Sequence, residues 1–364
     1  MGVQDAIKYY NDQGGIDGVP MNLVWADSKY TIPGMFAAYT RALTKGAVLV
    51  LPQAAHESEA LASTLPSDGV PAVIQGEVSF TAIPWVYVAE APYAYAGLGF
   101  LKWLKENWDW EGKGRAPKVA IFYMDVSYSK ASIKPSRLYA EKLGIDYGHE
   151  EVVPPVIVDY TPYLLRIKEY DPDFVLTTFC AAQPAAIMKD AHKLGIHERY
   201  QWVHLNYGQS PVLWDLCGDL AEDNWGVSFV KCYPYDFPGV ELVNECYAKY
   251  HPGEPWPGNS PTPDPTYIVG FNSGRLGCEA IKMTAARVGV ANITGTEVKK
   301  TLDSLTDFDT LGVTHPLDFS EGGVGTTAVR LNLLKNHELT TKSEWVIVTP
   351  DELKALGIWE EMTK

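Results

Sequence analysis

The sequence is short of basic residues. Lysine and arginine total 30 against 45 aspartates and glutamates, which leaves a net charge of −15 and a pI near 5.0. A surface that binds nucleic acid or an anionic membrane needs a dominant positive face, so this balance argues against both kinds of partner. No apolar run approaches the roughly 18 residues that a membrane span requires, and we expect no spanning segment in the chain.

Cysteine is also scarce, and its spacing does not match a metal site. No CxxC pair occurs, which argues against zinc. The odd count leaves at least one thiol free in a monomer. We interpret the cysteines as small buried apolar residues, while a disulfide among the last four stays open because pairing cannot be deduced from sequence. The five residues are Cys180, Cys217, Cys232, Cys246 and Cys278.

Motifs of common enzymes are absent. The chain has neither GxGxxG nor GxxxxGK(S/T), which cradle nucleotide phosphates, and it lacks the GxSxG elbow of α/β-hydrolases. The tetrad His56-Glu57-Ser58-Glu59 is not the HExxH zinc motif, and neighbours along one turn rarely face a single centre. We therefore expect solvated or pocket-lining side chains there, with no metal, no cofactor and no catalytic residue.

What the sequence does contain is a regular alternation of helical and strand patterns. Val3, Ala6, Ile7 and Tyr10 recur at helical spacing and predict a first helix. The alternation that follows predicts an α/β fold with parallel sheets covered by helices on both faces. Strands are expected over 22–26, 47–51, 70–74, 85–88, 119–123, 149–153, 174–178, 201–205, 225–230, 328–334 and 345–348.

A long predicted helix over 266–287 contains Gly270, Gly274 and Gly277. Each glycine inside a helix costs about 1 kcal/mol relative to alanine. We interpret these glycines as places where another segment packs too closely for a side chain.

Polar and aromatic side chains follow several strands in the second half of the chain. Ligands of open parallel sheets bind outside the carboxyl ends of the strands, so we expect these side chains at one edge. They suit a small molecule with a flat or apolar part, and the absence of a nucleophile–base pair indicates binding rather than catalysis. For Tyr128 the alternative is an ordinary surface loop. The side chains are Tyr128, Phe179, Gln183, Asn206, Tyr207 and Gln209.

The segment 10–18, Tyr-Asn-Asp-Gln-Gly-Gly-Ile-Asp-Gly, resembles the early signature of the periplasmic substrate-binding proteins of the branched-chain amino acid (Leu/Ile/Val) ABC transporter type. The ordered set of further motifs is more specific than any one of them, and the resemblance spans nearly the whole chain. These motifs are Asp68-Gly69-Val70-Pro71, the strand and loop over 118–128, the segment 164–173, Ala191-His192-Lys193-Leu194-Gly195 and Phe308-Asp309-Thr310.

The resemblance implies two doubly wound parallel-sheet lobes joined by a three-crossing hinge, the type I periplasmic-binding fold. Lobe one would comprise 1–115 plus 240–313 and lobe two 116–239 plus 314–364, with a ligand cleft between them that closes by hinge motion. The implied function is that of a periplasmic or other extracytoplasmic solute-binding protein. Such a protein hands a small molecule to an ABC transporter permease and performs no chemistry.

The chain departs from this family at its start. The family begins with a strand and a Gly-rich loop before the first helix, whereas Met1 stands almost at that helix here. We expect a missing upstream segment that carries this strand together with an export signal. The alternative is that another segment of the chain fills the gap.

The chain also departs from the family in the implied pocket. The family's amino-acid binders hold the ligand carboxylate with Ser and Thr in two loops, which here read Gln53-Ala54-Ala55-His56 and Gly76-Glu77-Val78-Ser79. They hold the α-amine with acids, at positions that here fall near Tyr93 and on Asn206. Because a buried ammonium without charge partners is costly, a standard branched-chain amino acid is disfavoured.

We therefore predict an acid with an aromatic or bulky apolar part, with His56 serving its carboxylate and Glu77 facing a donor group. A ligand sensor or regulator of the same fold is the alternative, and an enzyme is a third hypothesis that recovery of unchanged ligand would exclude. The predicted ligand-binding residues are Ala55, His56, Glu77, Ser79, Tyr93, Tyr95, Tyr128, Phe179, Gln183, Asn206 and Tyr207.

Overall fold

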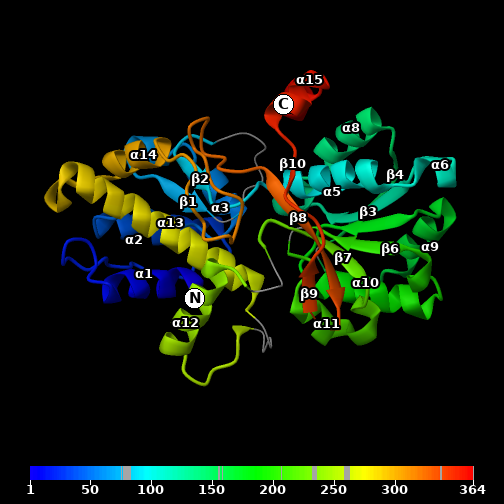
Figure 1. Ribbon diagram of the computed structural model, residues 1–364, viewed down its shortest axis with the longest axis horizontal. Helices are drawn as coiled ribbons and strands as arrows, with labels where there is room; N and C mark the ends of the chain where they lie inside the picture. The colour runs from blue at the N-terminus through cyan, green and yellow to red at the C-terminus, as the bar shows by residue number, and fades with distance from the viewer. Residues whose placement is uncertain are drawn as a thin grey trace. The chain divides into compact units, whose positions relative to one another are not determined.

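The computed structural model describes the whole chain except residues 75, 77–82, 155, 158, 206, 232–235, 258–262, 337 and 364. The chain separates into two compact units, each of which contains segments distant in sequence (Figure 1). Unit 1 consists of Met1–Pro92, Asp236–Glu254 and Pro265–Thr326. Unit 2 consists of Tyr93–Tyr235, Pro255–Asp264 and Thr327–Lys364.

These units differ from the predicted lobes at their boundaries. We expected residues 1–115 in lobe one, but helix α5 (Ala94–Asn107) belongs to unit 2. The reason is close packing, because a Cβ added to Gly99 of α5 would lie 2.1 Å from the Val329 side chain of unit 2. Residues 314–326 were expected in lobe two but belong to unit 1, where Val324 forms a parallel bridge with Val88.

Unit 2 is built on one sheet whose strand order is β10-β8-β7-β6-β5-β3-β4, with β9 also paired to β8. Strands β3 to β7 run parallel to one another, and β8 pairs antiparallel with β7, β9 and β10. The pattern-based prediction of a parallel α/β sheet is confirmed here. The strands are β3 (Lys118–Met124), β4 (Asp146–Val153), β5 (Phe174–Thr177), β6 (Gln201–His204), β7 (Asn224–Ser228), β8 (Ala328–Lys335), β9 (Glu338–Thr341) and β10 (Val346–Ile347).

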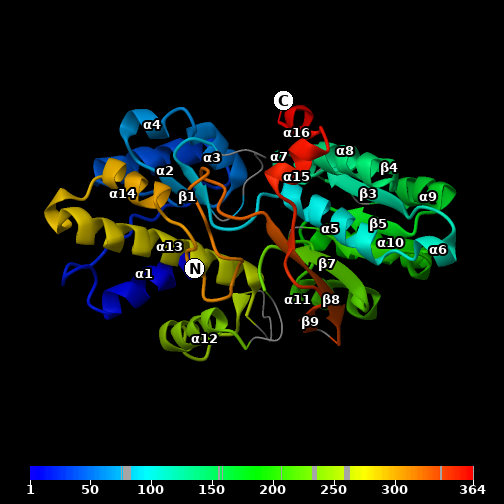
Figure 2. The same ribbon diagram turned by 45° about the horizontal axis from the view of Figure 1, so that its top comes forward.

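Helices cover both faces of the unit 2 sheet. Helices α5 and α8 lie on one face, and α9, α10 and α11 lie on the other (Figure 2). Burial on both faces explains why β3 is a continuous apolar run, in which Val119 to Phe122 are fully buried. The further helices of unit 2 are α6 (Trp110–Lys113), α7 (Ser127–Lys130), α8 (Ile133–Leu143), α9 (Thr161–Tyr170), α10 (Ala182–Lys193), η1 (His197–Arg199), α11 (Pro211–Cys217), η2 (Gly218–Ala221), α15 (Pro350–Ala355) and α16 (Trp359–Met362).

Unit 1 has a smaller sheet. Strands β1 (Ala72–Ile74) and β2 (Val86–Val88) are parallel, and single bridges add Val50 beside β1 and Val324 beside β2. The sheet packs on a core that contains Tyr87, Leu276 and Phe319. The helices of unit 1 are α1 (Gly2–Asp12), α2 (Ile32–Thr44), α3 (Ala55–Leu61), α4 (Leu65–Asp68), α12 (Pro238–Tyr250), α13 (Pro265–Val288), η4 (Val290–Asn292) and α14 (Gly295–Asp303).

Two predicted strands of unit 1 are wrong. Residues 22–26 form no strand, and 47–51 retain only the bridge of Val50 to Ala72. A strand exists only where a neighbour completes its hydrogen-bond ladder, and 22–26 finds no such neighbour among the described residues. Its Trp25 side chain is 63% exposed, whereas an internal parallel strand would be buried.

Two of the three glycines of α13, Gly274 and Gly277, behave as predicted. A Cβ on Gly274 would lie 3.0 Å from the Val3 Cα and 2.9 Å from the Ala6 Cβ of helix α1. A Cβ on Gly277 would lie 2.8 Å from the Leu49 side chain. The missing side chains therefore let α1 and the segment around Leu49 approach α13 closely, and Figure 1 shows α1 lying along α13.

Candidate functional site

The predicted ligand residues of unit 1 that the structure describes lie at the start of α3. Ala55 is buried and His56 is half-buried in the first turn of this helix. The Nε2 atom of His56 is buried and has no hydrogen-bond partner among the described residues. The His56 ring lies edge-on to Tyr30, with ring centroids 4.4 Å apart. Glu77 and Ser79 lie outside the described residues.

The neighbouring acid Glu57 has a local structural role. Its buried carboxylate accepts a hydrogen bond of 3.2 Å from the backbone N–H of Gln53, which steadies the turn before α3. The described residues contain no group of three or more histidine, cysteine, aspartate or glutamate side chains placed to bind a metal ion. The tetrad that begins at His56 therefore shows no metal-site geometry.

Sequence reasoning missed a second acid in unit 1. Glu90 stands two residues beyond the end of β2, and its side chain is completely buried. Buried carboxylates are uncommon unless they are paired or serve a site. The sequence could have indicated Glu90, because it is an acid just after an apolar strand pattern, and ligands of parallel sheets bind at the carboxyl ends of strands.

Unit 2 contains an aromatic cluster of Tyr93, Tyr128, Tyr207 and Phe229. The ring of Tyr93 is central, with centroid distances of 6.4 Å to Tyr128, 6.4 Å to Tyr207 and 5.9 Å to Phe229. Tyr207 and Phe229 are 6.4 Å apart. Three of these contacts are edge-to-face and the Tyr93–Phe229 contact is tilted, and ring contacts at these separations are favourable.

The strand ends explain why these four rings meet. Tyr128 follows β3, Tyr207 follows β6 and Phe229 follows β7, while Tyr93 precedes the first residue of α5. Parallel neighbours end at one edge of the sheet, so their following loops converge there. Sequence analysis predicted three of the rings and missed Phe229, although the end of the strand pattern at 225–230 was a usable signal.

Hydrogen bonds fix the short helix α7, which carries Tyr128 and forms where the sequence predicted a loop. The Ser129 hydroxyl accepts from the Met124 N–H at 2.9 Å and lies 2.5 Å from the Thr178 hydroxyl. The Tyr128 hydroxyl hydrogen-bonds the Cys180 thiol. Cys180 is exposed rather than buried as expected, but local desolvation raises the pKa of its thiol, and the hydrogen bond from Tyr128 partly offsets the increase. The thiol is therefore neutral near pH 7 and adds no charge to the aromatic cluster.

His204 at the end of β6 is likewise uncharged. It is fully buried, and burial lowers its pKa to about 3. Its Nδ1 lies 2.9 Å from the Thr177 hydroxyl on the neighbouring strand β5. The carboxyl end of β6 therefore offers a ligand no cationic histidine.

The other predicted residues of unit 2 lie in different surroundings. Tyr95 and Phe179 are each 1% exposed and belong to the interior of the unit. Gln183 is half-buried in the first turn of α10, and its backbone N–H donates to the Cys180 carbonyl. Asn206 lies outside the described residues. Tyr93, Tyr128 and Tyr207 are thus the predicted residues that the structure brings together.

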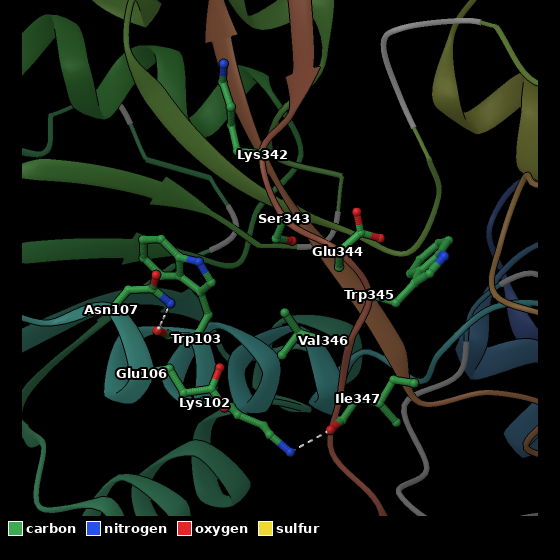
Figure 3. Close-up of a pocket in the computed structure, with 10 residues that line it drawn as sticks. All are labelled: Lys102, Trp103, Glu106, Asn107, Lys342, Ser343, Glu344, Trp345, Val346 and Ile347. Atoms are coloured by element: carbon green, nitrogen blue, oxygen red, sulfur yellow. Dashed lines mark hydrogen bonds between the residues drawn. The ribbon is translucent and has the colours of Figure 1, made fainter.

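A separate pocket of about 510 Å³ lies on unit 2, between the end of α5 and the segment before β10 (Figure 3). Lys102 closes one side, because its ammonium donates to the Ile347 carbonyl at 2.8 Å and pairs with Glu352 at 2.7 Å. None of the predicted ligand residues lines this pocket. Its lining residues are Lys102, Trp103, Glu106, Asn107, Lys342, Ser343, Glu344, Trp345, Val346 and Ile347.

Comparison with known proteins places the fold. The family model described as "Periplasmic binding protein" matches residues 1–335. No curated protein shows significant sequence similarity to the chain. Among the described residues, no helix combines the length and the apolar character needed to cross a membrane.

Solved structures of similar fold include three with stated ligands or transport roles. A branched-chain amino acid ABC transporter protein from Thermus thermophilus with bound valine is 20% identical, with a TM-score of 0.84 over 97% of this chain and 92% of that one. A fatty acid ABC transporter substrate-binding protein from Thermomonospora curvata is 16% identical, with a TM-score of 0.80 over 95% and 87%. An ABC transporter solute-binding protein from Rhodopseudomonas palustris in complex with 3,4-dihydroxybenzoic acid is 15% identical, with a TM-score of 0.77 over 96% and 94%.

Proposed function

Because this chain belongs to the periplasmic binding protein family, we propose that it captures a small carboxylic acid with an aromatic or bulky apolar part. Members of this family are binding proteins of ABC transporters rather than enzymes. We propose that both units contribute ligand contacts, through His56 in unit 1 and through the aromatic cluster in unit 2.

The aromatic cluster is the observation that carries this proposal. Tyr128 and Tyr207 are half-buried and contact the buried Tyr93 ring, and Tyr93 and Tyr207 in turn contact the buried Phe229 ring. The two half-buried rings with their phenol hydroxyls suit a flat or bulky apolar ligand group. The neighbouring groups Cys180 and His204 are uncharged at neutral pH. An aromatic or aliphatic ligand body therefore fits these surroundings.

His56 supplies the polar end of the proposed site. Its buried Nε2 lacks a hydrogen-bond partner among the described residues, and a ligand carboxylate would satisfy it. The named ligands of the similar structures, valine, fatty acid and 3,4-dihydroxybenzoic acid, differ in shape but share a carboxyl group. This shared group supports an acid as the ligand. We propose that the aromatic cluster determines which apolar part the acid carries.

Calorimetry with a small panel tests the ligand class. We expect heat of binding with benzoate or phenylacetate and none with leucine at the same concentration. Tight leucine binding without a response to aromatic acids would overturn the proposal. Native mass spectrometry of protein purified from its host gives an independent result, because a copurified acid of matching mass would identify the ligand directly.

We further propose that the ligand is delivered to an ABC permease and that the protein works outside the cytoplasmic membrane, as the family does. Deleting the gene in the source organism should abolish high-affinity uptake of the labelled acid. Unchanged uptake together with altered expression of other genes would instead favour the ligand sensor of the same fold.

A further inference from the structure

The loop that connects residue 26 to helix α2 contains two consecutive residues in an unusual backbone conformation. Lys29 has φ +53° and Tyr30 has φ +56°, which is the left-handed region that non-glycine residues avoid. Two such residues in succession cost conformational free energy. Surrounding contacts must therefore hold this loop in place.

Side-chain hydrogen bonds from the loop itself provide that support. Asp27 accepts from the Lys29 N–H at 2.8 Å, and the Ser28 hydroxyl accepts from the Tyr30 N–H at 3.3 Å. Thr31 donates to the Ser28 carbonyl at 2.9 Å and caps α2 by accepting from Gly34 at 3.2 Å. The loop is thus a defined structure that ends on a helix cap.

The strained backbone places a large aromatic ring in an exposed position. Tyr30 is 66% exposed, so burial of its ring does not account for the conformation. The ring instead stands edge-on to His56, at 4.4 Å and an interplanar angle of 67°. An exposed ring held by a strained backbone beside a histidine whose Nε2 lacks a partner among the described residues is typical of a ligand site rather than of core packing.

We propose that Tyr30 is a ligand-contacting residue of unit 1 that flanks the group bound by His56 and selects a planar, aromatic carboxylate. This inference rests on the proposed function, in which His56 serves the ligand carboxylate. The Tyr30 ring offers an aromatic edge or face to a ring attached directly to that carboxylate. A saturated ring of the same size lacks the matching quadrupole and gains less from the contact.

Benzoate and cyclohexanecarboxylate are the appropriate probes, because they share the carboxylate and the ring size and differ in aromaticity. Calorimetry on the full chain should show that the wild type prefers benzoate. We expect Tyr30→Leu to weaken benzoate binding by about five-fold and cyclohexanecarboxylate binding much less. Tyr30→Phe should retain the wild-type preference, because it keeps the ring.

Trp25→Leu is the matched control, since Trp25 is a similarly exposed aromatic of the same unit without a ring contact to His56. We expect it to leave both affinities unchanged, and thermal unfolding of each variant checks that folding is intact. If Tyr30→Leu keeps the wild-type preference for benzoate, or if Trp25→Leu weakens benzoate binding equally, the role of Tyr30 is overturned while the proposed function stands. A wild type that binds neither acid would remove the proposed function and this inference with it.

Discussion

The hydroxyl of Tyr267 on α13 donates a 2.7 Å hydrogen bond to the buried carboxylate of Asp5 on α1. The same carboxylate lies 2.7 Å from the His251 Nε2 and 2.9 Å from the Lys8 ammonium. Asp5 therefore links the first helix to α13 and to the residue that follows α12. Asp5 therefore stabilises the same contact between α1 and α13 that the close packing of Gly274 on Val3 and Ala6 forms.

Replacing Asp5 should strongly destabilise unit 1. Asp5→Ala leaves the buried Tyr267 hydroxyl and the His251 ring without their acceptor, and we expect a loss of about 3 kcal/mol in the free energy of unfolding. Asp12 on the same helix is the control, because it pairs with Lys249 and Tyr250 at the exposed surface. Urea denaturation should show little change for Asp12→Ala. Equal losses in both variants would contradict the special role of Asp5.

The Asp5 contribution should depend on pH in the acid range. Burial raises the pKa of this carboxyl, but hydrogen bonds from Tyr267, Lys8 and His251 outweigh burial, and the pKa lies below its usual range. A folded-state pKa lower than the unfolded value of about 3.9 means that the carboxylate stabilises the fold above that pH. This stabilisation is lost as pH falls through the folded-state pKa.

Urea denaturation of wild type and Asp5→Asn at several pH values measures this effect. The stability difference between the two proteins should be constant near neutral pH and should shrink below about pH 4. A difference that grows on acidification would show that the folded-state pKa is raised instead.

The two close-packed glycines of α13 should respond differently to the same change. At Gly274 a methyl group meets the backbone of Val3, which cannot move without shifting α1, and we expect Gly274→Ala to cost about 2 kcal/mol. At Gly277 the obstacle is the flexible end of the Leu49 side chain, and the gain in helix propensity offsets repacking. Gly277→Ala should therefore stay within about 1 kcal/mol of wild type in thermal or urea unfolding. A reversed order would show that α1 adapts more easily than Leu49.

Tyr128→Ala should weaken binding of the aromatic acid by about tenfold, because it removes one ring of the unit 2 cluster. The fold should remain intact, since Tyr128 lies in the short helix α7, which Ser129 anchors independently. Tyr163→Ala is the control, because Tyr163 is a half-buried tyrosine on α9 that contacts Arg166 outside the cluster. Calorimetry that finds unchanged affinity for Tyr128→Ala would move the ligand contacts elsewhere.

Strand and helix patterns predicted unit 2 more accurately than unit 1. The run at 119–123 is apolar throughout and became a central strand with partners on both sides, β4 and β5. The run at 22–26 looks similar in sequence but forms no strand. A local run of apolar residues indicates that a segment favours an extended backbone. A strand also needs a second strand at hydrogen-bond distance, and only the tertiary structure provides one.

The candidate site shows the same division. The rule that ligands bind at strand ends predicted that Tyr128 and Tyr207 would converge, and they share contacts with Tyr93. Tyr30 was not predicted, because left-handed backbone at two non-glycine residues leaves no pattern in the sequence. The end of the strand pattern at 225–230 pointed to Phe229, but its contact with Tyr207 depends on β6 and β7 being neighbours in the sheet.

The sequence by itself determined the fold class, the family and the acidic net charge, because composition, periodicity and ordered motifs are properties of the chain alone. Tertiary structure decided that α5 belongs to unit 2, since helix packing on Val329 depends on a residue more than two hundred positions away. It also decided which aromatic rings meet and which lie in the core. Such contacts join segments that are distant in sequence, and a local sequence pattern does not show which distant segments come together in space.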